Sequence, residues 1–161
     1  VRERHPDAFI IYKPHPDVES RNRKGRIPDE EALRYADRVV RNVRMDVLLG
    51  IVDEVHTLTS LTGFEALLRG IEVHAYGGPF YAGWGLTHDR IDFPRRKAGL
   101  SLEELIAGTL ILYPSYYDWQ TKGFCTPEDI CHRLTQPKGQ MNSEFFLRTF
   151  AALREKIRNV F

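Results

Sequence analysis

Two short stretches of the sequence combine residue types that could bind a phosphate group. The first is Lys13-Pro-His-Pro-Asp17, in which two prolines hold Lys13 and His15 in an extended segment. A lysine ammonium and a histidine N–H can both donate hydrogen bonds to an anion. Taken alone, this stretch is equally consistent with a rigid surface turn whose histidine has no ligand.

The second stretch is rich in hydroxyl groups and precedes a helical pattern. Its candidate phosphate ligands are Thr59, Ser60, Thr62 and Gly63. Hydroxyls and backbone N–H groups at the start of a helix can surround an anion. Serine and threonine also cap helices that bind nothing, and on this turn alone capping is the favoured interpretation.

The helical pattern after this turn predicts an apolar face made of Phe64, Leu67 and Leu68. We place Glu65 in its first turn and Arg69 in its last, where each charge would complement the helix dipole.

A glycine-rich loop with several aromatic residues follows at positions 77–85. It contains Phe80, Tyr81 and Trp84. Because loops run over protein surfaces and often carry binding residues, we expect Tyr81 and Trp84 to face a ligand.

Strands and helices alternate along the chain and would position these stretches. Apolar and β-branched runs predict strands at 8–12, 54–57 and 72–76, the first of them buried on both faces. Right-handed crossovers make such strands parallel and place helices on both faces of the sheet. We therefore predict an α/β, Rossmann-like parallel sheet, with Lys13–Asp17 and the Ser60 turn at the carboxyl ends of adjacent strands.

Later segments are predicted from their capping residues and turns. A shorter helix is expected at 45–52, and 87–92 is expected to be a loop or an edge strand. A capping box at Ser101 predicts a helix to Leu112, and Thr126 starts another that ends near Leu134. Residues 113–119 are expected to form an aromatic loop, and 143–161 a final helix.

The remaining histidines and cysteines are given structural roles. We expect His56 and His74 to be packed strand residues, and leave His88 open. Cys125 and Cys131, six positions apart in a predicted helical segment, lack the second ligand pair of a zinc site. Asp89 and Asp92 are not spaced as an Asp-x-Asp metal pair, so no metal-dependent reaction is expected.

Composition limits the function classes. At 161 residues, with 42% hydrophobic and 28% charged residues, the chain suits one globular domain. A net charge of +1 argues against a general nucleic-acid binder. No run approaches the roughly 20 apolar residues that span a bilayer. The chain opens with Val1 rather than methionine, so we expect a piece of a longer protein.

Three motifs, in order, closely resemble the bacterial capsule polysaccharide biosynthesis family of KpsC/LipA type. They are Lys13–Asp17, the stretch 52–70 that contains the Ser60 turn, and Gly78-Pro-Phe-Tyr-Ala-Gly-Trp-Gly-Leu-Thr87. The resemblance runs from about residue 8 to residue 118. It implies a glycosyltransferase that moves the acidic sugar Kdo from CMP-Kdo onto a β-Kdo linker on a phospholipid.

The resemblance also implies an architecture, in which this chain is the C-terminal half of a GT-B enzyme. Residues 1–135 would be the CMP-Kdo-binding domain. Residues 136–161 would form a helix that packs on the N-terminal domain, which is absent here and would hold the catalytic carboxylate. The protein would work in the cytoplasm, with peripheral attachment to the anionic inner membrane as an open alternative for the final helix.

By analogy with other transferases that use CMP-activated sugars, His15 and Pro16 would touch the CMP phosphate, as would Ser60 to Thr62. His15 would stabilise the leaving-group charge with help from Lys13. Glu65 would bind ribose hydroxyls. No metal or cofactor is implied.

Two other function classes stay open at this point. One is a non-catalytic interaction module that docks a capsule assembly complex. The other is a nucleotide-sugar epimerase-like domain, because such epimerases share the GT-B architecture. A preference for uridine over cytidine nucleotides would favour the epimerase-like domain.

Overall fold

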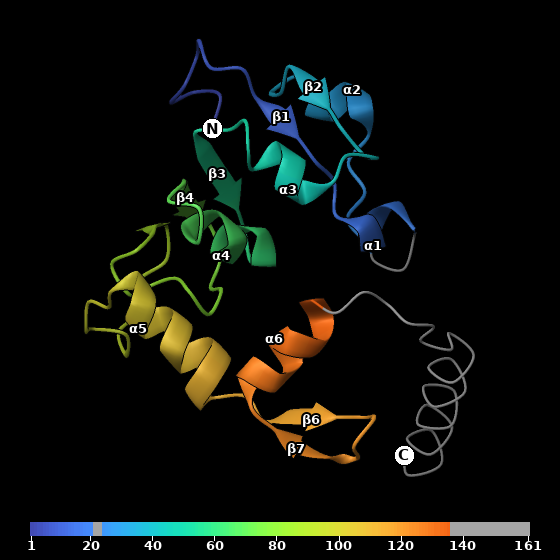
Figure 1. Ribbon diagram of the computed structural model, residues 1–161. Helices are drawn as coiled ribbons and strands as arrows, with labels where there is room; N and C mark the ends of the chain where they lie inside the picture. Colours follow the sequence, from blue (N-terminus) through green and yellow to red (C-terminus); the bar gives the residue numbers. More distant parts are fainter. Residues whose placement is uncertain (21–23, 136–161) are drawn as a thin grey trace, which may run out of the picture. The chain divides into compact units, whose positions relative to one another are not determined.

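A computed structural model describes residues 1–20 and 24–135, which fall into two compact units. The first unit spans residues 1–106 and the second begins at residue 107 (Figure 1). The predicted final helix lies outside the described residues. The division after residue 135 therefore stays a prediction.

The first unit begins with a two-stranded parallel sheet. Its strands are β1 (Ile11–Tyr12) and β2 (Arg38–Val39), and helices α1 (Pro16–Glu19) and α2 (Asp29–Ala32) lie between them in sequence. The predicted strand at 8–12 is thus shorter than expected. It is also not buried on both faces, because Phe9 is 69% exposed and β1 pairs with β2 alone among the described strands.

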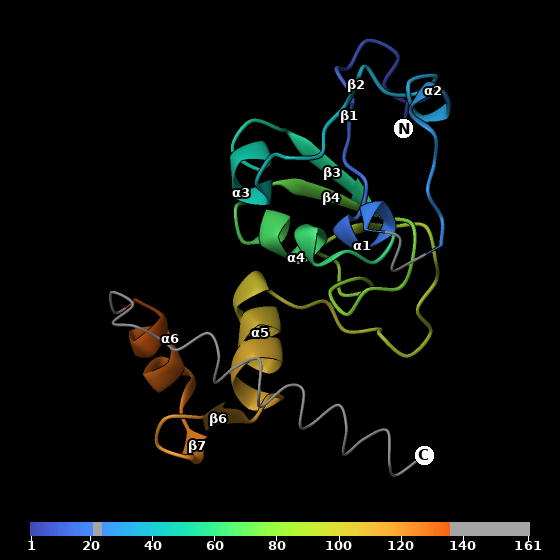
Figure 2. The same cartoon turned by 90° about the vertical axis from the view of Figure 1, so that its right-hand side faces the viewer.

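A three-stranded parallel sheet forms the centre of this unit (Figures 1 and 2). Its order is β3 (Glu54–Thr57), β4 (Glu72–Ala75) and β5 (His88–Asp89), with β5 at one edge. Helix α3 (Met45–Leu48) precedes β3, and α4 (Leu61–Leu67) connects β3 to β4. The predicted α/β class with parallel strands is confirmed.

The core lies on one face of this sheet. Val55 and Val73 are neighbours in register on β3 and β4 and point to the same face. Phe64 and Leu67 of α4 pack there, as does Leu105 of α5 (Leu102–Ile106). Burial of these side chains is the main favourable contribution to folding in this unit.

Three details predicted for α4 are wrong. Leu68 follows the last helical residue and is 44% exposed, so it lies outside the core. Glu65 lies in the second turn of α4, and Arg69 lies beyond its end. The helix therefore carries no acidic residue in its first turn and no basic residue in its last.

The second unit contains a π-helix, a hairpin and a helix. The π-helix η1 (Ala107–Leu112) follows α5, so the helix predicted to run from Ser101 to Leu112 changes type midway. Strands β6 (Tyr116–Asp118) and β7 (Gly123–Cys125) pair antiparallel, and α6 (Pro127–Thr135) follows.

The hairpin corrects two expectations. The aromatic loop predicted at 113–119 contains strand β6, and Cys125 lies in β7 rather than in a helix. The aromatic residues Tyr117 and Phe124 lie opposite each other in register and are exposed, whereas Asp118 is buried. No helix in the described part of the chain is both long and apolar enough to cross a membrane.

Candidate functional site

His15 is exposed and caps helix α1 directly after the carboxyl end of β1. Its Nδ1 accepts a hydrogen bond from the backbone N–H of Asp17 at 3.1 Å, and Pro16 occupies the first helical turn. In the neutral ring this bond places the proton on Nε2. His15 thus offers an Nε2–H donor on a backbone that Pro14 and Pro16 restrain.

Lys13 is half-buried and its ammonium already has a partner. Its Nζ donates to the carbonyl oxygen of Arg41 at 2.8 Å. An ammonium carries three N–H donors, so two are left for an anion.

An ion-pair network around Arg41 supports this segment and was not predicted. The Arg41 guanidinium pairs with Asp29 and, at 2.7 Å, with Glu19 of α1. The hydrogen bonds that Arg41 donates to Asp29 and Glu19 raise the pKa of Arg41, and the bond from Arg41 lowers the pKa of Asp29. Because the partners are far apart in sequence, no local pattern indicated them.

The Ser60 turn caps helix α4. Ser60 Oγ accepts the backbone N–H of Thr62 at 3.2 Å and donates to Thr62 Oγ1 at 3.0 Å. The backbone N–H of Ser60 is itself bonded to Thr57 Oγ1 at 3.3 Å. Thr59 is exposed, whereas Ser60 and Thr62 are half-buried. The favoured capping interpretation is confirmed, and these bonds fix the hydroxyls in one arrangement.

Gly63 and Tyr81 pack against each other and hold the Ser60 turn in place. Tyr81 is fully buried, and its hydroxyl donates to the Ser60 carbonyl at 2.6 Å. A Cβ on Gly63 would lie 2.2 Å from that hydroxyl oxygen, and the Gly63 N–H is bonded to Ser60 O. Tyr81 therefore lies in the core and not on the loop surface as expected. The contact of Tyr81 and Gly63 with a ligand stays a prediction.

Burial raises the pKa of Tyr81 to about 12, so the phenol remains a donor at neutral pH. Its hydroxyl positions the Ser60 carbonyl, and its ring packs in the core of this unit.

Trp84 is also less available than predicted. It packs partly against the core, its Nε1 donates to the Phe80 carbonyl at 2.8 Å, and the Arg96 guanidinium lies over its ring. Phe80 keeps 42% of its surface exposed. Gly77 allows this loop to approach the Ser60 turn closely, since a Cβ there would lie 2.7 Å from the Leu58 carbonyl oxygen.

Glu65 is half-buried on α4 and keeps its carboxylate uncommitted. Its side chain makes no hydrogen bond or ion pair with the described residues, while its backbone carbonyl accepts from Arg69 at 2.9 Å. A half-buried carboxylate with no partner is suited to accept hydrogen bonds from hydroxyl groups.

The two stretches lie at carboxyl ends of strands, but not of adjacent strands. Lys13 directly follows β1, and Ser60 lies three residues after the end of β3. However, β1 pairs with β2 while β3 pairs with β4, so the predicted adjacency is wrong. No hydrogen bond or ion pair joins the two stretches within the described ranges.

Comparisons with known proteins agree with the resemblance seen in the sequence. The family model described as capsule polysaccharide biosynthesis protein matches residues 1–116. The capsule polysaccharide modification protein LipA of Neisseria meningitidis serogroup B is 49% identical over the whole chain, which spans 23% of that protein. The lipopolysaccharide-processing protein LpsZ of Rhizobium meliloti is 44% identical over 72% of the chain, a match covering 26% of LpsZ.

Solved structures give the same result. KpsC of Thermosulfurimonas dismutans, described as a β-Kdo 2,7 transferase, matches with a TM-score of 0.72 and 44% identity over 83% of the chain. The β-Kdo 2,4 transferase of the same organism matches with a TM-score of 0.71 and 34% identity, also over 83% of the chain. The chain corresponds to 42% and 41% of these two structures, respectively.

Proposed function

The chain belongs to the capsule polysaccharide biosynthesis protein family, and from that premise we propose that it is the donor-binding part of a Kdo glycosyltransferase. The donor is CMP-Kdo, and the acceptor is a β-Kdo linker on a phospholipid. The chain spans about a quarter of its curated relatives. The complete reaction therefore also requires the N-terminal GT-B domain, which would supply the catalytic carboxylate, and this chain alone would be inactive.

The observation that carries the proposal is the match to KpsC. A TM-score of 0.72 at 44% identity, over most of the chain, relates it to a protein described as a Kdo transferase. The match covers less than half of that structure, which is consistent with one half of a two-domain enzyme.

The geometry supports a role in holding the leaving group. As the glycosidic bond of CMP-Kdo breaks, negative charge grows on the CMP phosphate. The Nε2–H of His15 and the free N–H donors of Lys13 can stabilise this charge, and so can the hydroxyls of Thr59 and Thr62. The hydroxyl of Ser60 donates to Thr62 Oγ1, so Ser60 would have to turn this hydroxyl to the phosphate when the donor binds. Each of these residues lies beyond the carboxyl end of a strand, where open α/β sheets bind nucleotides.

Glu65 is proposed to bind the ribose. Its carboxylate has no partner among the described residues, and it is one turn along the helix that the Ser60 turn caps. A ribose presents two adjacent hydroxyl donors, which two carboxylate oxygens can accept. We propose no metal for the transfer, and a location in the cytoplasm at the inner face of the membrane.

Calorimetric titration with CMP and with UMP tests the proposal. We expect saturable binding of CMP that is at least tenfold tighter than that of UMP, equivalent to about 1.4 kcal/mol. Tighter binding of UMP would favour an epimerase-like domain instead, and failure of both nucleotides to bind would favour an interaction module.

A matched pair of variants locates the site. His15→Ala should weaken CMP binding about tenfold or more, because a hydrogen bond to a charged phosphate is lost. His132→Ala, which removes an exposed histidine of α6, should leave CMP affinity unchanged. Equal affinity of His15→Ala and the wild type would remove His15 from the site.

A further inference from the structure

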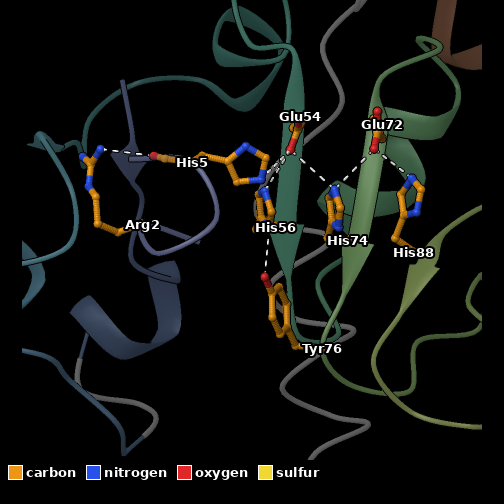
Figure 3. A network of polar contacts seen from close by, with 8 residues as sticks. All are labelled: Arg2, His5, Glu54, His56, Glu72, His74, Tyr76 and His88. Atoms are coloured by element: carbon orange, nitrogen blue, oxygen red, sulfur yellow. Dashed lines mark hydrogen bonds and ion pairs between the residues drawn. The ribbon is translucent and has the colours of Figure 1, made fainter. Parts of the chain in front are cut away.

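The face of the central sheet opposite the core carries a row of histidines and glutamates (Figure 3). We call it the histidine row; it consists of His5, Glu54, His56, Glu72, His74 and His88. None of these residues was assigned to nucleotide binding.

Strand periodicity and register create the row. Strands β3 and β4 both begin with Glu-Val-His, so the glutamate and the histidine of each strand project to one face while the valine projects to the core. In register, Glu54 lies opposite Glu72 and His56 opposite His74, and β5 adds His88 opposite His74. The three imidazole rings of β3, β4 and β5 stack, with centroids 4.4 and 4.6 Å apart.

The Nε2 atoms of the row converge on carboxylate oxygens. Glu72 Oε1 lies 2.8 Å from His88 Nε2 and 3.4 Å from His74 Nε2. Glu54 Oε2 lies 3.4 Å from the same His74 atom. His74 Nε2 therefore faces two glutamates that are direct neighbours on adjacent strands.

Two features of this arrangement call for a cation. His74 is buried, with a side chain only 10% exposed, yet neither of its ring nitrogens makes a hydrogen bond with the described residues. Two carboxylates placed opposite each other on neighbouring strands also repel. A positive ion at the His74 Nε2 position would satisfy the buried nitrogen and offset the repulsion.

We propose that Glu72, His74 and His88 bind a divalent transition-metal ion of the Zn²⁺ type. Tetrahedral coordination with bonds of roughly 2.0–2.1 Å places neighbouring ligand atoms about 3.3 Å apart. The contacts of 2.8 and 3.4 Å from Glu72 Oε1 to the two Nε2 atoms lie close to that spacing. Two imidazoles and one carboxylate suit zinc-like ions, whereas Mg²⁺ and Ca²⁺ require oxygen ligands.

The backbone holds Glu72, His74 and His88 more rigidly than it holds the neighbouring trio of His5, Glu54 and His56. His5, Glu54 and His56 also bring their ligand atoms together, but His5 lies in a non-strand segment. Glu72, His74 and His88 all lie on paired strands. Rigid strands hold ligands in place before the metal arrives, which favours binding.

We place the ion toward the amino ends of the strands, because the Nε2 atoms of His74 and His88 face Glu72. Glu72 is the first residue of β4, whereas the Ser60 turn follows the carboxyl end of β3. The ion would stabilise the sheet and would take no part in Kdo transfer.

Calorimetric titration of the chelator-treated protein with ZnCl₂ tests the site, after removal of any polyhistidine tag. We expect about one tight equivalent, at least tenfold weaker binding in Glu72→Gln and His88→Gln, and no binding of Mg²⁺. His132→Gln is the matched control and should bind Zn²⁺ like the wild type. Thermal melting should rise with Zn²⁺ in the wild type and the control, and less in the two site variants.

Both site variants replace exposed side chains, so they should fold, which circular dichroism checks. The proposal is overturned if the wild type takes up no stoichiometric Zn²⁺, or if Glu72→Gln and His88→Gln bind it as well as His132→Gln. Loss of binding only in His5→Gln would also overturn it, by assigning the ion to the neighbouring trio.

Discussion

The two faces of the β3-β4-β5 sheet have opposite characters, although they are built from alternate residues of the same strands. On one face Val55 and Val73 pack against α4, and Val73 is 1% exposed. On the other face the same strands present Glu54, His56 and Glu72, with His74 buried beside them. One face is stabilised by burial of apolar surface, and the other is held by charge and hydrogen bonding.

The difference shows how a short strand can serve two purposes. The valine face requires apolar side chains whose volume and shape fit the core. The histidine face depends on atoms that lie within hydrogen-bond and ion-pair distances across strands. Stability should therefore respond to substitutions on the first face, and ion binding to substitutions on the second.

The largest effect expected is on the valine face. Phe64→Ala should lower the free energy of unfolding by about 3–5 kcal/mol, because Phe64 is 4% exposed and its removal leaves a cavity. In metal-free protein, His88→Ala should cost less than about 1 kcal/mol, since its pair with Glu72 is exposed. Urea denaturation of both variants measures the two losses of unfolding free energy. Equal losses would contradict the proposed difference between the two faces.

A second prediction concerns ligand binding at the carboxyl end of the sheet. Glu65→Gln should weaken CMP binding by about 1.5–3 kcal/mol if a charged hydrogen bond to ribose is lost. Binding of cytosine, which has no ribose, should not change. Calorimetry gives both affinities. Unchanged CMP affinity with a lowered melting temperature would instead restrict Glu65 to a role in the stability of α4.

The packing that positions the Ser60 turn can be tested at Gly63. Gly63→Ala should destabilise the protein by about 1–3 kcal/mol, because the added methyl group would overlap the Tyr81 hydroxyl. Gly99→Ala is the matched control, since a Cβ there meets nothing within 4 Å. Urea denaturation should show a clear loss only for Gly63→Ala. Similar stabilities of the two variants would mean that the Tyr81 contact is loose.

The smallest effect is expected for Asp37, whose contribution to stability should be lost in acid. The backbone N–H of Ile10 and the Arg2 guanidinium lower the pKa of Asp37 below its ordinary 3.8. A lowered pKa in the folded state adds stability above pH 3.8 that is lost as the pH falls through the folded-state value. Wild type should therefore exceed Asp37→Asn in stability near neutrality, and the gap should close in strong acid. Urea denaturation at several pH values measures this difference in stability. A difference between wild type and Asp37→Asn that does not change with pH would contradict the prediction.

Sequence patterns predicted the local features of the fold well. The capping box at Ser101 is confirmed by reciprocal hydrogen bonds with Glu104, and the N-cap at Thr126 by reciprocal bonds with Asp129. Strands β3 and β4 lie where the β-branched runs predicted them. These features depend on residues within a few positions of one another, so a single sequence is enough to identify them.

Features that depend on contacts between distant segments were missed. Tyr81 was placed in a surface loop, although its hydroxyl reaches back 21 positions to the Ser60 carbonyl and draws the ring into the core. The histidine row arises from the register of three strands, which a single sequence does not show. A usable indication was present nonetheless, because Glu-Val-His occurs at the start of both predicted strands.

The most direct test of the central claim is to map CMP binding on the protein by NMR. Titration with CMP should shift the backbone amide signals of residues 15–19 and 59–65, at the carboxyl ends of β1 and β3, and leave those of Glu72, His74 and His88 unchanged. That result would place the nucleotide at the carboxyl edge, apart from the histidine row. Shifts confined to the histidine row, or no saturable shifts at all, would contradict the assignment of this chain as the donor-binding part of a Kdo transferase.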